Sequence, residues 1–529
     1  MITKLEIVKS ILTKSGATLD AALGQTGYGW APSNIALLKY WGKRDAELNL
    51  PLNDSVSVSL GNLGAYTTLS IAKEDEYYLN GKKLDLNNAF SRRLAAFLAL
   101  FTNKHFKVVS QMNVPVAAGV ASSACGFAAL VRALDDLFNL HLALNDLMIL
   151  ARLGSGSACR SLLDGFSWWQ RGERSDGMDS YAVPISSAAW DDLRIGLFLI
   201  SDAPKPLSSR EAMARTVATS TSYAQFALDA NNSLSALINA IERRDLDMVG
   251  VIAERNASLM HQAMLDCAQP INYSSSQTNK LKDLVIKARQ NGLKVYFTQD
   301  AGSNLQIIFQ ASQLDAVLEW FKEFSANLVV VAPLADCNKM VEGLDAITHR
   351  AKGFIPKMLA HYRGDLHRAF SVMITRANDS GEIEVLLQQR SLQKYHSQGL
   401  WANACCGHPL ALSDVKMAAA KRLEEELGLK VTLDLLKLKG EFIYRADLGG
   451  GLKEFELDHL LEVRWTKSLG ALTCHLNPAE VSKVRWVTLK ELRQELEHHP
   501  QQFVAWLKPL LNATRVSFLD YLEPQCLAG

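Results

Sequence analysis

The chain contains no uninterrupted apolar run of membrane-spanning length, so we expect no membrane partner. Its eight cysteines form no CxxC pair, which argues against a structural zinc site and against a disulfide framework. The opening segment, MITKLEIVKSILTKSG, lacks the apolar core of a signal peptide. Free thiols without such a signal favour a cytoplasmic protein.

Charge is nearly balanced, with 56 basic and 55 acidic residues. No excess of basic residues points to nucleic acid, and we expect no partner of that class. A small anionic substrate stays open, because a pocket for it needs only a few local cations.

At 529 residues the chain is too long for a single hydrophobic core, and two or three domains are expected. The sequence has no internal repeat and no low-complexity segment. Residues 1–27 are interpreted as an N-terminal extension with a short amphipathic helix. The apolar residues that give this helix its spacing are Leu5, Val8, Ile11 and Leu12.

Strand-like and helix-like segments alternate through residues 28–345, which we assign to a first domain. Expected elements there are strands at 55–60 and 107–114 and a helix at 90–101. A mixed segment from 342 to 364 carries glycine, proline and clustered basic residues, so the boundary is placed there, near residue 350. The second domain is assigned residues 346–529, with strands at 369–375 and 384–390 and a helix at 414–427.

The segment PVAAGVASSACGFAAL, residues 115–130, has the features of a phosphate-binding loop. It is rich in small residues, which leave no bulk between the backbone and a ligand, and it joins a predicted strand to a predicted helix. The free N–H groups at the start of that helix can bind a phosphate. Ser122 and Ser123 can add hydroxyl donors. A tight strand-to-helix turn without a ligand is the alternative.

Three further segments accompany this loop: APSNIALLKYWGKRD (31–45), LGSGSACRS (153–161) and YFTQDAGSN (296–304). Together the four motifs resemble the mevalonate diphosphate decarboxylases of the galactokinase–homoserine kinase–mevalonate kinase (GHMP) superfamily, over roughly residues 28–340. The resemblance implies an α+β, GHMP-kinase-like two-layer domain with its cleft between subdomains. It also implies that ATP phosphorylates the tertiary hydroxyl of 5-diphosphomevalonate, after which phosphate and carbon dioxide leave and isopentenyl diphosphate forms.

The resemblance implies catalytic roles for three residues. Asp300 is the base that readies the tertiary alcohol, and an Asx-turn cap before Gly302 is the alternative. Arg160 pairs with the carboxylate that departs, unless it forms a structural salt bridge. Lys39 lies near the reacting oxygen. The residues that the resemblance places in contact with substrate or ATP are Asn34, Tyr40, Trp41, Ser122, Ser123, Ser155, Ser157, Ser209 and Met213.

Several of these positions have a second interpretation. Trp41 is expected to form a wall of the site, and Asn34 is as well explained by a structural role. Ala212 stands where the family usually has glycine before the methionine, so the contacts of residues 207–213 depart from the family's pattern. Mg²⁺ is implied with ATP, because charge developing on the transferred phosphoryl group needs cations. No dedicated Mg²⁺ ligand set is readable in this half.

Histidines and glutamates in the second domain are the residue types of a divalent-metal site. HYRGDLHRAF supplies two histidines, WANACCGHP supplies a third, and an ExE pair would face one side of a strand. Three histidines and two glutamates can complete an octahedral site for Mg, Mn or Zn. Scattered surface residues are the alternative. The candidate metal ligands are His361, His367, His408, Glu454 and Glu456.

The expected helix at 414–427 ends in KRLEEELGL, with Gly428 as its C-terminal stop. The segment resembles the Nudix helix, but Ser413, Lys421 and Arg422 replace residues of the hydrolase motif, which argues against pyrophosphate hydrolysis. The same departures occur in type 1 isopentenyl-diphosphate isomerases, which residues 350–515 resemble throughout. The resemblance implies an α/β/α Nudix-like sandwich and isomerisation of isopentenyl diphosphate to dimethylallyl diphosphate.

By the same resemblance, Cys406 and Glu456 flank the substrate's double bond, where one delivers a proton and the other removes one. Tyr444 assists near Glu456, and Trp506 stabilises the carbocation through its π face. An inert buried thiol and a core indole are the alternatives. Cys405 should point away if the segment is extended.

Cations of the second domain match positions that contact the diphosphate in the isomerases, although each alone would be explained as a solvated surface charge. These residues are Lys357, Arg390, Lys394 and Arg422. Glu426 is expected to hold a Mg²⁺ that bridges the diphosphate.

The product implied for the first domain is the substrate implied for the second, which makes a bifunctional isoprenoid-pathway enzyme the leading hypothesis. In the alternative, the first domain acts on a mevalonate monophosphate or is a simple small-molecule kinase, and the second is a regulatory or binding Nudix-like module. The expected partners are small-molecule diphosphates. A homodimer through the decarboxylase domain stays open.

Overall fold

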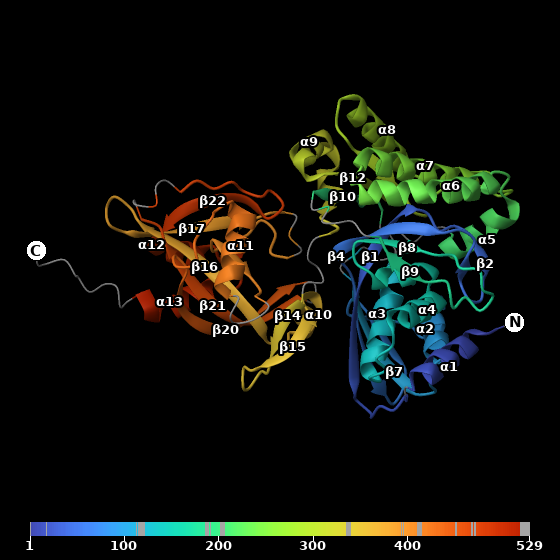
Figure 1. Ribbon diagram of the computed structural model, residues 1–529, viewed down its shortest axis with the longest axis horizontal. Coiled ribbons are helices and arrows are strands. Elements are labelled where there is room, and N and C mark those ends of the chain that lie inside the picture. Colours follow the sequence, from blue (N-terminus) through green and yellow to red (C-terminus); the bar gives the residue numbers. More distant parts are fainter. Residues whose placement is uncertain are drawn as a thin grey trace, which may run out of the picture. The chain divides into compact units, whose positions relative to one another are not determined.

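The computed structural model describes residues 2–16, 18–112, 114, 122–185, 190, 192–201, 207–334, 340–392, 394, 396–409, 415–449, 452–466, 469 and 472–518. It divides into two units, 1–337 and 338–529, each with its own hydrophobic cores (Figure 1). None of the helices in these ranges combines the length and the apolar composition that a membrane span requires.

The large sheet of the first unit is organised around its longest strand, β4 (Ser55–Ala72), which pairs antiparallel with β1, β7 and β8. Seven strands of the described residues join this sheet, in the order β6-β5-β7-β4-β8-β9 with β1 paired to β4. The other strands are β1 (Thr26–Leu38), β5 (Glu76–Leu79), β6 (Lys82–Lys83), β7 (His105–Met112), β8 (Phe166–Trp169) and β9 (Ala182–Pro184), and β2 (Lys43–Asp45) pairs with β3 (Leu50–Pro51) outside it. The strands expected at 55–60 and 107–114 are thus confirmed.

Helices pack on one face of this sheet and enclose the first core. The central one, α3 (Ser122–Leu137), packs directly on β1. A Cβ at Gly29 would lie 2.0 Å from the Ala129 oxygen, so this close approach requires glycine. The others are α1 (Lys4–Ser15), α2 (Ala89–Leu98) and α4 (Leu144–Gly154). α2 confirms the helix expected at 90–101.

The N-terminal helix α1 is also confirmed, and Val8, Ile11 and Leu12 pack on the core as expected. Ile7 joins them. The prediction for Leu5 is wrong, since that side chain is 41% exposed. Leu5 lies to one side of the stripe that residues 7, 8 and 11 present to the core.

A smaller sheet with the order β11-β12-β10-β13 completes the first unit. Helices cover it and enclose two further groups of buried side chains, which gives the expected α+β two-layer arrangement. Its strands are β10 (Leu193–Phe198), β11 (Tyr296–Thr298), β12 (Leu305–Gln310) and β13 (Leu328–Val331). The helices are α5 (Ser209–Thr219), α6 (Tyr223–Glu242), α7 (Leu246–Leu265), α8 (Ser276–Gln290) and α9 (Leu314–Trp320).

The second unit is a curled sheet between two layers of helices, as expected for an α/β/α Nudix-like sandwich. Helix α11 (Val415–Leu427) covers one face, and α12 (Leu489–His498) and α13 (Leu507–Phe518) cover the other. The central strands β16 and β21 run parallel. The strands are β14 (Met340–Leu344), β15 (Ala351–Pro356), β16 (His367–Ala377), β17 (Ile383–Arg390), β18 (Trp401–Ala402), β19 (Cys405–Gly407), β20 (Lys437–Gly449), β21 (Leu452–Arg464) and β22 (Val481–Thr488), and α10 (Lys357–Arg363) precedes β16.

Candidate active sites

Asp300 and Lys39 form a close ion pair in the first unit. Lys39 follows β1 and Asp300 follows β11, so the pair joins segments that are distant in the sequence. Lys39 Nζ lies 2.6 Å from Asp300 Oδ1, with the lysine side chain 2% exposed and the aspartate 22%. Burial lowers the pKa of Lys39, and the charge of Asp300 opposes that shift. The carboxylate is therefore held at the edge of the protein interior beside a fixed cation.

Helix α7 supports this pair through two residues that the sequence did not indicate. Asn256 Oδ1 accepts a hydrogen bond from the Lys39 backbone N–H at 2.8 Å, and His261 Nε2 lies 3.2 Å from the Asp300 carbonyl oxygen. Burial lowers the pKa of His261 to about 3, so its ring is neutral. The Gly302 N–H donates to the Asp300 carbonyl oxygen, which closes the turn. The side-chain carboxylate of Asp300 pairs with Lys39 instead.

Arg160 is a buried cation near this pair. It belongs to a 3₁₀ segment, Gly156–Leu162, and its Nη1 donates to Ser55 Oγ at 2.8 Å. Burial lowers its pKa, while the charges of Cys159 and Asp300 act in the opposite direction. Among the described residues no carboxylate lies within ion-pair distance of Arg160, and its Nε has no hydrogen-bond partner. The guanidinium is therefore not committed to the structural salt bridge that was its alternative.

The loop before Arg160 meets Tyr40 and the start of α3. The Tyr40 ring packs on Trp169 at a centroid distance of 4.7 Å, and a Cβ at Gly156 would lie 2.7 Å from the Tyr40 oxygen. Glycine is therefore required where the loop crosses the tyrosine. Ser155 Oγ and Ser123 Oγ are 3.4 Å apart, which brings the two predicted serine-bearing loops together.

The other predicted contacts of the first unit are spread over its interior. Asn34 is buried and donates to Ser161 Oγ at 2.7 Å, which favours its structural alternative. Trp41 packs with Ala212 and Met213 in one buried cluster, as a wall would. Ser209 is the first residue of α5, and Ser157 is half-buried in the 3₁₀ segment. The backbone of Ser122 opens α3, but its side chain and residues 115–121 of the predicted phosphate loop lie outside the described residues.

An apolar cavity of about 390 Å³ lies between α2, β7 and α3. Leucine, methionine and phenylalanine side chains form most of its wall, and Ser110, Arg93 and Ser123 are among its polar residues. Its size and lining suit a flat aromatic ring, and Ser123 on its wall belongs to the start of α3, where a phosphate was expected.

Lys43, on β2, is a further cation that the sequence did not single out; its Nζ donates to Asn49 Oδ1 at 2.6 Å.

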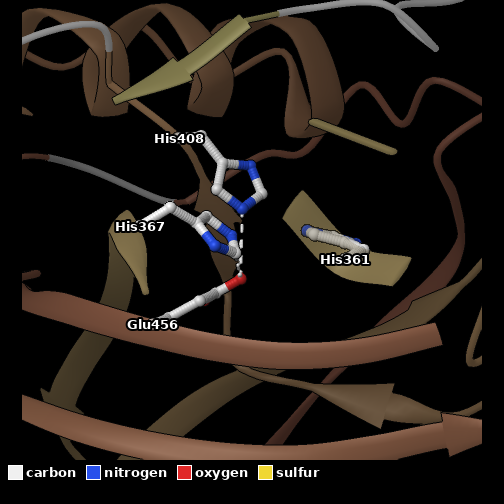
Figure 2. Close-up of side chains that lie close together, drawn as sticks. All are labelled: His361, His367, His408 and Glu456. Atoms are coloured by element: carbon white, nitrogen blue, oxygen red, sulfur yellow. Dashed lines mark hydrogen bonds and ion pairs between the residues drawn. The ribbon is translucent and has the colours of Figure 1, made fainter. Parts of the chain in front are cut away.

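In the second unit, His361, His367, His408 and Glu456 each present a ligand atom to one small space (Figure 2). These atoms all lie within 4.8 Å of one another, and Glu456 Oε1 is 3.1 Å from His408 Nε2 and 3.4 Å from His367 Nε2. Parallel pairing places His367 directly opposite Glu456. Burial, followed by the neighbouring imidazoles, lowers the pKa of His361 well below its ordinary value. Imidazoles with a carboxylate are donors that a divalent metal binds in proteins, so the group fits a metal.

Glu454 was expected in this group and lies beside it, although it is not among the four residues whose ligand atoms gather within 4.8 Å. It shares the buried face of β21 with Glu456, so it stays a predicted ligand. Glu454 accepts from Tyr444 Oη at 3.0 Å and lies 3.8 Å from His396 Nε2. Tyr444 Oη is also 2.7 Å from Glu456, so it links the two carboxylates. His396 is a buried neighbour that the sequence did not indicate.

Cys406 and Cys405 face opposite sides of β19, as expected. Cys405 is buried with the residues of α11, whereas Cys406 packs against the cluster that contains Tyr444 and Trp506. Burial raises the pKa of Cys406 to about 12, so its thiol keeps its proton at neutral pH. Trp506 Nε1 donates to Asn403 Oδ1 at 3.0 Å, and the Arg390 guanidinium lies 5.3 Å from the indole centroid. The guanidinium of Arg390 therefore lies over the face of the indole ring.

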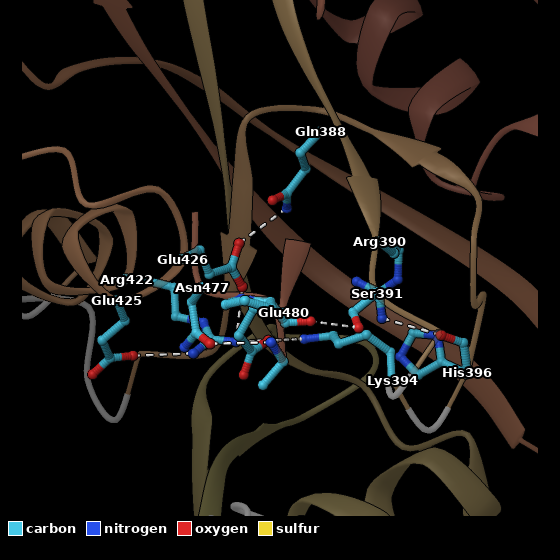
Figure 3. A network of polar contacts seen from close by, with 12 residues as sticks. Gln388, Arg390, Ser391, Lys394, His396, Arg422, Glu425, Glu426, Asn477 and Glu480 are labelled. Atoms are coloured by element: carbon cyan, nitrogen blue, oxygen red, sulfur yellow. Dashed lines mark hydrogen bonds and ion pairs between the residues drawn. The ribbon is translucent and has the colours of Figure 1, made fainter. Parts of the chain in front are cut away.

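Two of the predicted diphosphate-binding cations, Lys394 and Arg422, form a network with carboxylates, and Arg390 donates to the His396 carbonyl oxygen (Figure 3). Lys394 Nζ and Arg422 Nη2 share one oxygen of Glu480, at 2.5 and 2.8 Å. Arg422 also pairs with Glu425 and Glu426. Glu426 is buried and also accepts a hydrogen bond from Gln388. It is not one of the four residues of the histidine group. Lys357 opens α10, the helix that carries His361.

Family comparisons also separate a decarboxylase part of the chain from a Nudix part. A model described as diphosphomevalonate decarboxylase-like N-terminal domain matches residues 31–182, and one described as mevalonate 5-diphosphate decarboxylase C-terminal domain matches residues 195–358. A NUDIX domain model matches residues 365–507. The second match runs past residue 337, yet the strands β14 and β15 at its end pair within the sheet of the second unit.

Similar proteins and structures cover the first unit. The diphosphomevalonate decarboxylase of Candida albicans is 38% identical over 339 residues, which are 59% of this chain and 94% of that protein. The Bos taurus protein of the same name is 37% identical over 300 residues, 52% of this chain and 74% of its own. The mevalonate diphosphate decarboxylase structure from Enterococcus faecalis superposes with a TM-score of 0.54 at 36% identity, covering 58% of this chain and 96% of the other.

Proposed function

Since this chain belongs to the diphosphomevalonate decarboxylase family and carries a Nudix domain after the decarboxylase region, we propose that it is a bifunctional enzyme. Its first unit converts 5-diphosphomevalonate and ATP into isopentenyl diphosphate, carbon dioxide, phosphate and ADP. Its second unit isomerises isopentenyl diphosphate to dimethylallyl diphosphate. The observation that carries the proposal is the presence of two centres, Asp300 with Lys39 in one unit and the histidine group in the other, where Tyr444 bonds Glu456 and belongs to the cluster on which Cys406 packs.

In the first reaction, Asp300 accepts the proton of the tertiary hydroxyl as that oxygen attacks the γ-phosphate of ATP. Lys39 holds the carboxylate in place and offers positive charge beside the reacting oxygen. Arg160 has one buried donor without a partner, its Nε, and its guanidinium would pair with the substrate carboxylate. Phosphate then leaves with the C–O electrons, the C–C bond to the carboxylate breaks, and its electrons form the double bond as carbon dioxide departs.

ATP binding is supported by the cavity beside α3, which has room and apolar walls for the adenine ring. A related structure, 38% identical with a TM-score of 0.55, is described as a complex with MVAPP, AMPPCP and magnesium. We extend the use of ATP and Mg²⁺ to this chain. When bound, Mg²⁺ would neutralise charge on the phosphates.

Affinity for the diphosphate substrate should weaken as the pH rises through about 8. Burial, reinforced by the positive charges of Arg210, Lys4 and Arg93, lowers the pKa of Lys43 to about 8. The free enzyme therefore loses this cation above that pH, which removes an attraction for an anion. We expect KM for diphosphomevalonate to rise between pH 7 and pH 9, and Lys43→Arg to suppress the rise because a guanidinium stays charged. A wild-type KM that is constant over this range would contradict the prediction.

In the second reaction, Cys406 and Glu456 act on the two faces of the alkene. One adds a proton to the terminal methylene, which leaves a tertiary carbocation, and the other removes a proton from the carbon next to the diphosphate-bearing methylene. Tyr444 is hydrogen-bonded to Glu456 and assists its proton transfer. The Trp506 ring, which already lies near a guanidinium, suits a transient cation. His361, His367, His408 and Glu456 would hold a divalent metal, which when bound supplies positive charge to that carboxylate.

The residues of the Nudix helix favour isomerisation over diphosphate hydrolysis. Arg422, on α11, pairs with Glu425 and Glu426 of the same helix. Arg422 stands where the hydrolase motif has a glutamate, so a cation replaces one of the Mg²⁺ ligands that a hydrolase needs. Assays for phosphate or monophosphate release from isopentenyl diphosphate should find none.

Loss of one histidine should remove the metal of the second unit. We expect the purified wild-type chain to retain about one tightly bound divalent ion, since three histidines and a carboxylate form a full protein ligand set. His367→Gln should lose that ion, measured by elemental analysis after dialysis. His498→Gln changes an exposed histidine in the same unit and is the matched control. Equal metal content in the two variants would refute this assignment.

Substrate choice separates the main proposal from its rival, in which the first unit acts on a monophosphate. Carbon dioxide release should be measured with ATP and either 5-phosphomevalonate or 5-diphosphomevalonate. We expect release from the diphosphate only. Faster release from the monophosphate, or phosphorylation without loss of carbon dioxide, would favour the rival.

A further inference from the structure

The connection between β17 and β18 carries two largely buried polar side chains, Lys394 and His396, which are 15% and 6% exposed. Two backbone hydrogen bonds join the ends of this connection. Arg390 N–H donates to the Leu400 oxygen at 2.9 Å, and Gly399 N–H donates to the Arg390 oxygen at 3.1 Å. Lys394 belongs to the network of Figure 3. None of the roles assigned above involves the imidazole of His396.

This imidazole adjoins both parts of the proposed isomerase centre. Its centroid lies 6.2 Å from that of His361, a member of the histidine group, and 6.0 Å from that of the Trp506 indole. The rings meet edge to face in both pairs. Arg390 fixes the backbone at the same point, because its Nη2 donates to the His396 carbonyl oxygen at 3.2 Å. The position of His396 is therefore set from three sides.

Each nitrogen of the His396 ring has a polar neighbour. Nδ1 lies 3.1 Å from Ser397 Oγ, and Nε2 lies 3.8 Å from Glu454 Oε1. A hydroxyl that donates to Nδ1 leaves the ring proton on Nε2, the nitrogen that faces the carboxylate. The other oxygen of Glu454, Oε2, accepts from Tyr444 Oη at 3.0 Å. A phenol thus approaches one oxygen of this carboxylate, and an imidazole approaches the other.

Glu454 needs such partners because it is buried, at 4% exposed. A buried carboxylate is costly unless donors reach its oxygens. Partners of a metal-binding carboxylate also fix its orientation, and their loss typically reduces metal affinity or activity roughly 10- to 100-fold. The distance of 3.8 Å is longer than a hydrogen bond, and such distances in active sites often shorten when the ligands bind.

We propose that His396 is a positioning residue of the isomerase centre, which donates to Glu454 and holds that carboxylate beside the histidine group. His396 is not itself one of the four residues whose ligand atoms gather within 4.8 Å. It acts through Glu454, which stays a predicted ligand. This inference rests on the proposed function of the second unit.

The test compares three variants of His396. His396→Phe keeps an aromatic ring and removes both nitrogens, and His396→Asn carries an amide too short to reach Glu454. We expect each to lower kcat for isomerisation about tenfold and to weaken the affinity for Zn²⁺ alone by a similar factor, measured by competition with a chelating dye. KM for isopentenyl diphosphate should stay unchanged, since the predicted diphosphate contacts are intact.

His396→Gln should restore most of both losses, because its amide nitrogen can take the place of Nε2. A role in packing alone would not give this rescue, since Phe fills the space of the ring better than Gln. His498→Phe changes an exposed histidine of the same unit and is the matched control, which should keep wild-type values.

The inference is overturned if kcat or the Zn²⁺ affinity stays at the wild-type level in both His396→Phe and His396→Asn. It is equally overturned if His396→Gln loses as much as these two variants. If the wild-type chain does not isomerise isopentenyl diphosphate, or binds no Zn²⁺, it is the proposed function that fails, so the two failures are distinguishable.

Discussion

Replacing Asp300 by asparagine should reduce the rate of carbon dioxide release by about 10³-fold, the scale on which a positioned base contributes to catalysis. Asparagine keeps the size of the side chain but cannot accept the hydroxyl proton. It also leaves Lys39 buried without its counter-ion, 2.6 Å from an amide in place of a carboxylate. We therefore expect the loss in kcat, with KM for ATP little changed.

The same chain supplies a control for this variant, because isomerisation takes place in the other unit. Asp300→Asn should interconvert isopentenyl and dimethylallyl diphosphate at the wild-type rate. Asp283→Asn, an exposed aspartate on α8, serves as a matched change of charge in the first unit. Decarboxylation within tenfold of wild type in a folded Asp300→Asn protein would remove Asp300 from the role of base.

Replacing Cys406 by alanine should produce the opposite phenotype. Isomerisation should fall by about 10³-fold, since an alkene is a weak base and proton transfer depends on a close, aligned group. Decarboxylation should continue, so that isopentenyl diphosphate accumulates as the end product. Proton NMR of the products distinguishes the two isomers by the position of the double bond.

Cys474→Ala is the matched control, because this half-buried thiol lies in the same unit and is not near the histidine group. Cys406→Ser tests whether a hydroxyl substitutes for the thiol, whose pKa of about 12 keeps it protonated. An isomerisation rate in Cys406→Ala equal to that of Cys474→Ala would exclude the thiol from the reaction. It would leave the fold assignment of the second unit intact.

Short motifs allowed much of the metal centre to be predicted. His361 and His367 lie close together in the sequence, and His408 follows a recognisable cysteine. The ExE pair has the period of a strand. Strand periodicity gives Glu454 and Glu456 a shared face, but it does not give the partners of each carboxylate: Glu454 also contacts Tyr444 and lies near His396.

Supporting residues from distant parts of the chain could not be predicted in the same way. Asn256 and His261 are 217 and 39 residues from their partners in the Asp300 centre, and nothing in the pattern of an amphipathic helix marks them. Glu480 is 58 residues from Arg422 and 86 from Lys394, in a segment without a motif. Its pairing with both cations depends on tertiary packing, which local sequence does not specify.

The N-terminal helix illustrates the same limit. The spacing of Val8, Ile11 and Leu12 predicted the helix, but it also placed Leu5 on the buried face, whereas that side chain is 41% exposed. Periodicity therefore predicted the existence of the element, whereas the exact face that it buries depends on the neighbours that packing gives it.

The most direct test of two centres in one chain is a single incubation of the wild-type protein with ATP, Mg²⁺ and 5-diphosphomevalonate. Carbon dioxide should appear in a one-to-one ratio with the sum of isopentenyl and dimethylallyl diphosphates, and both isomers should be present at the end. Release of carbon dioxide with isopentenyl diphosphate as the sole product would contradict the account of the second unit, and consumption of ATP without carbon dioxide would contradict that of the first.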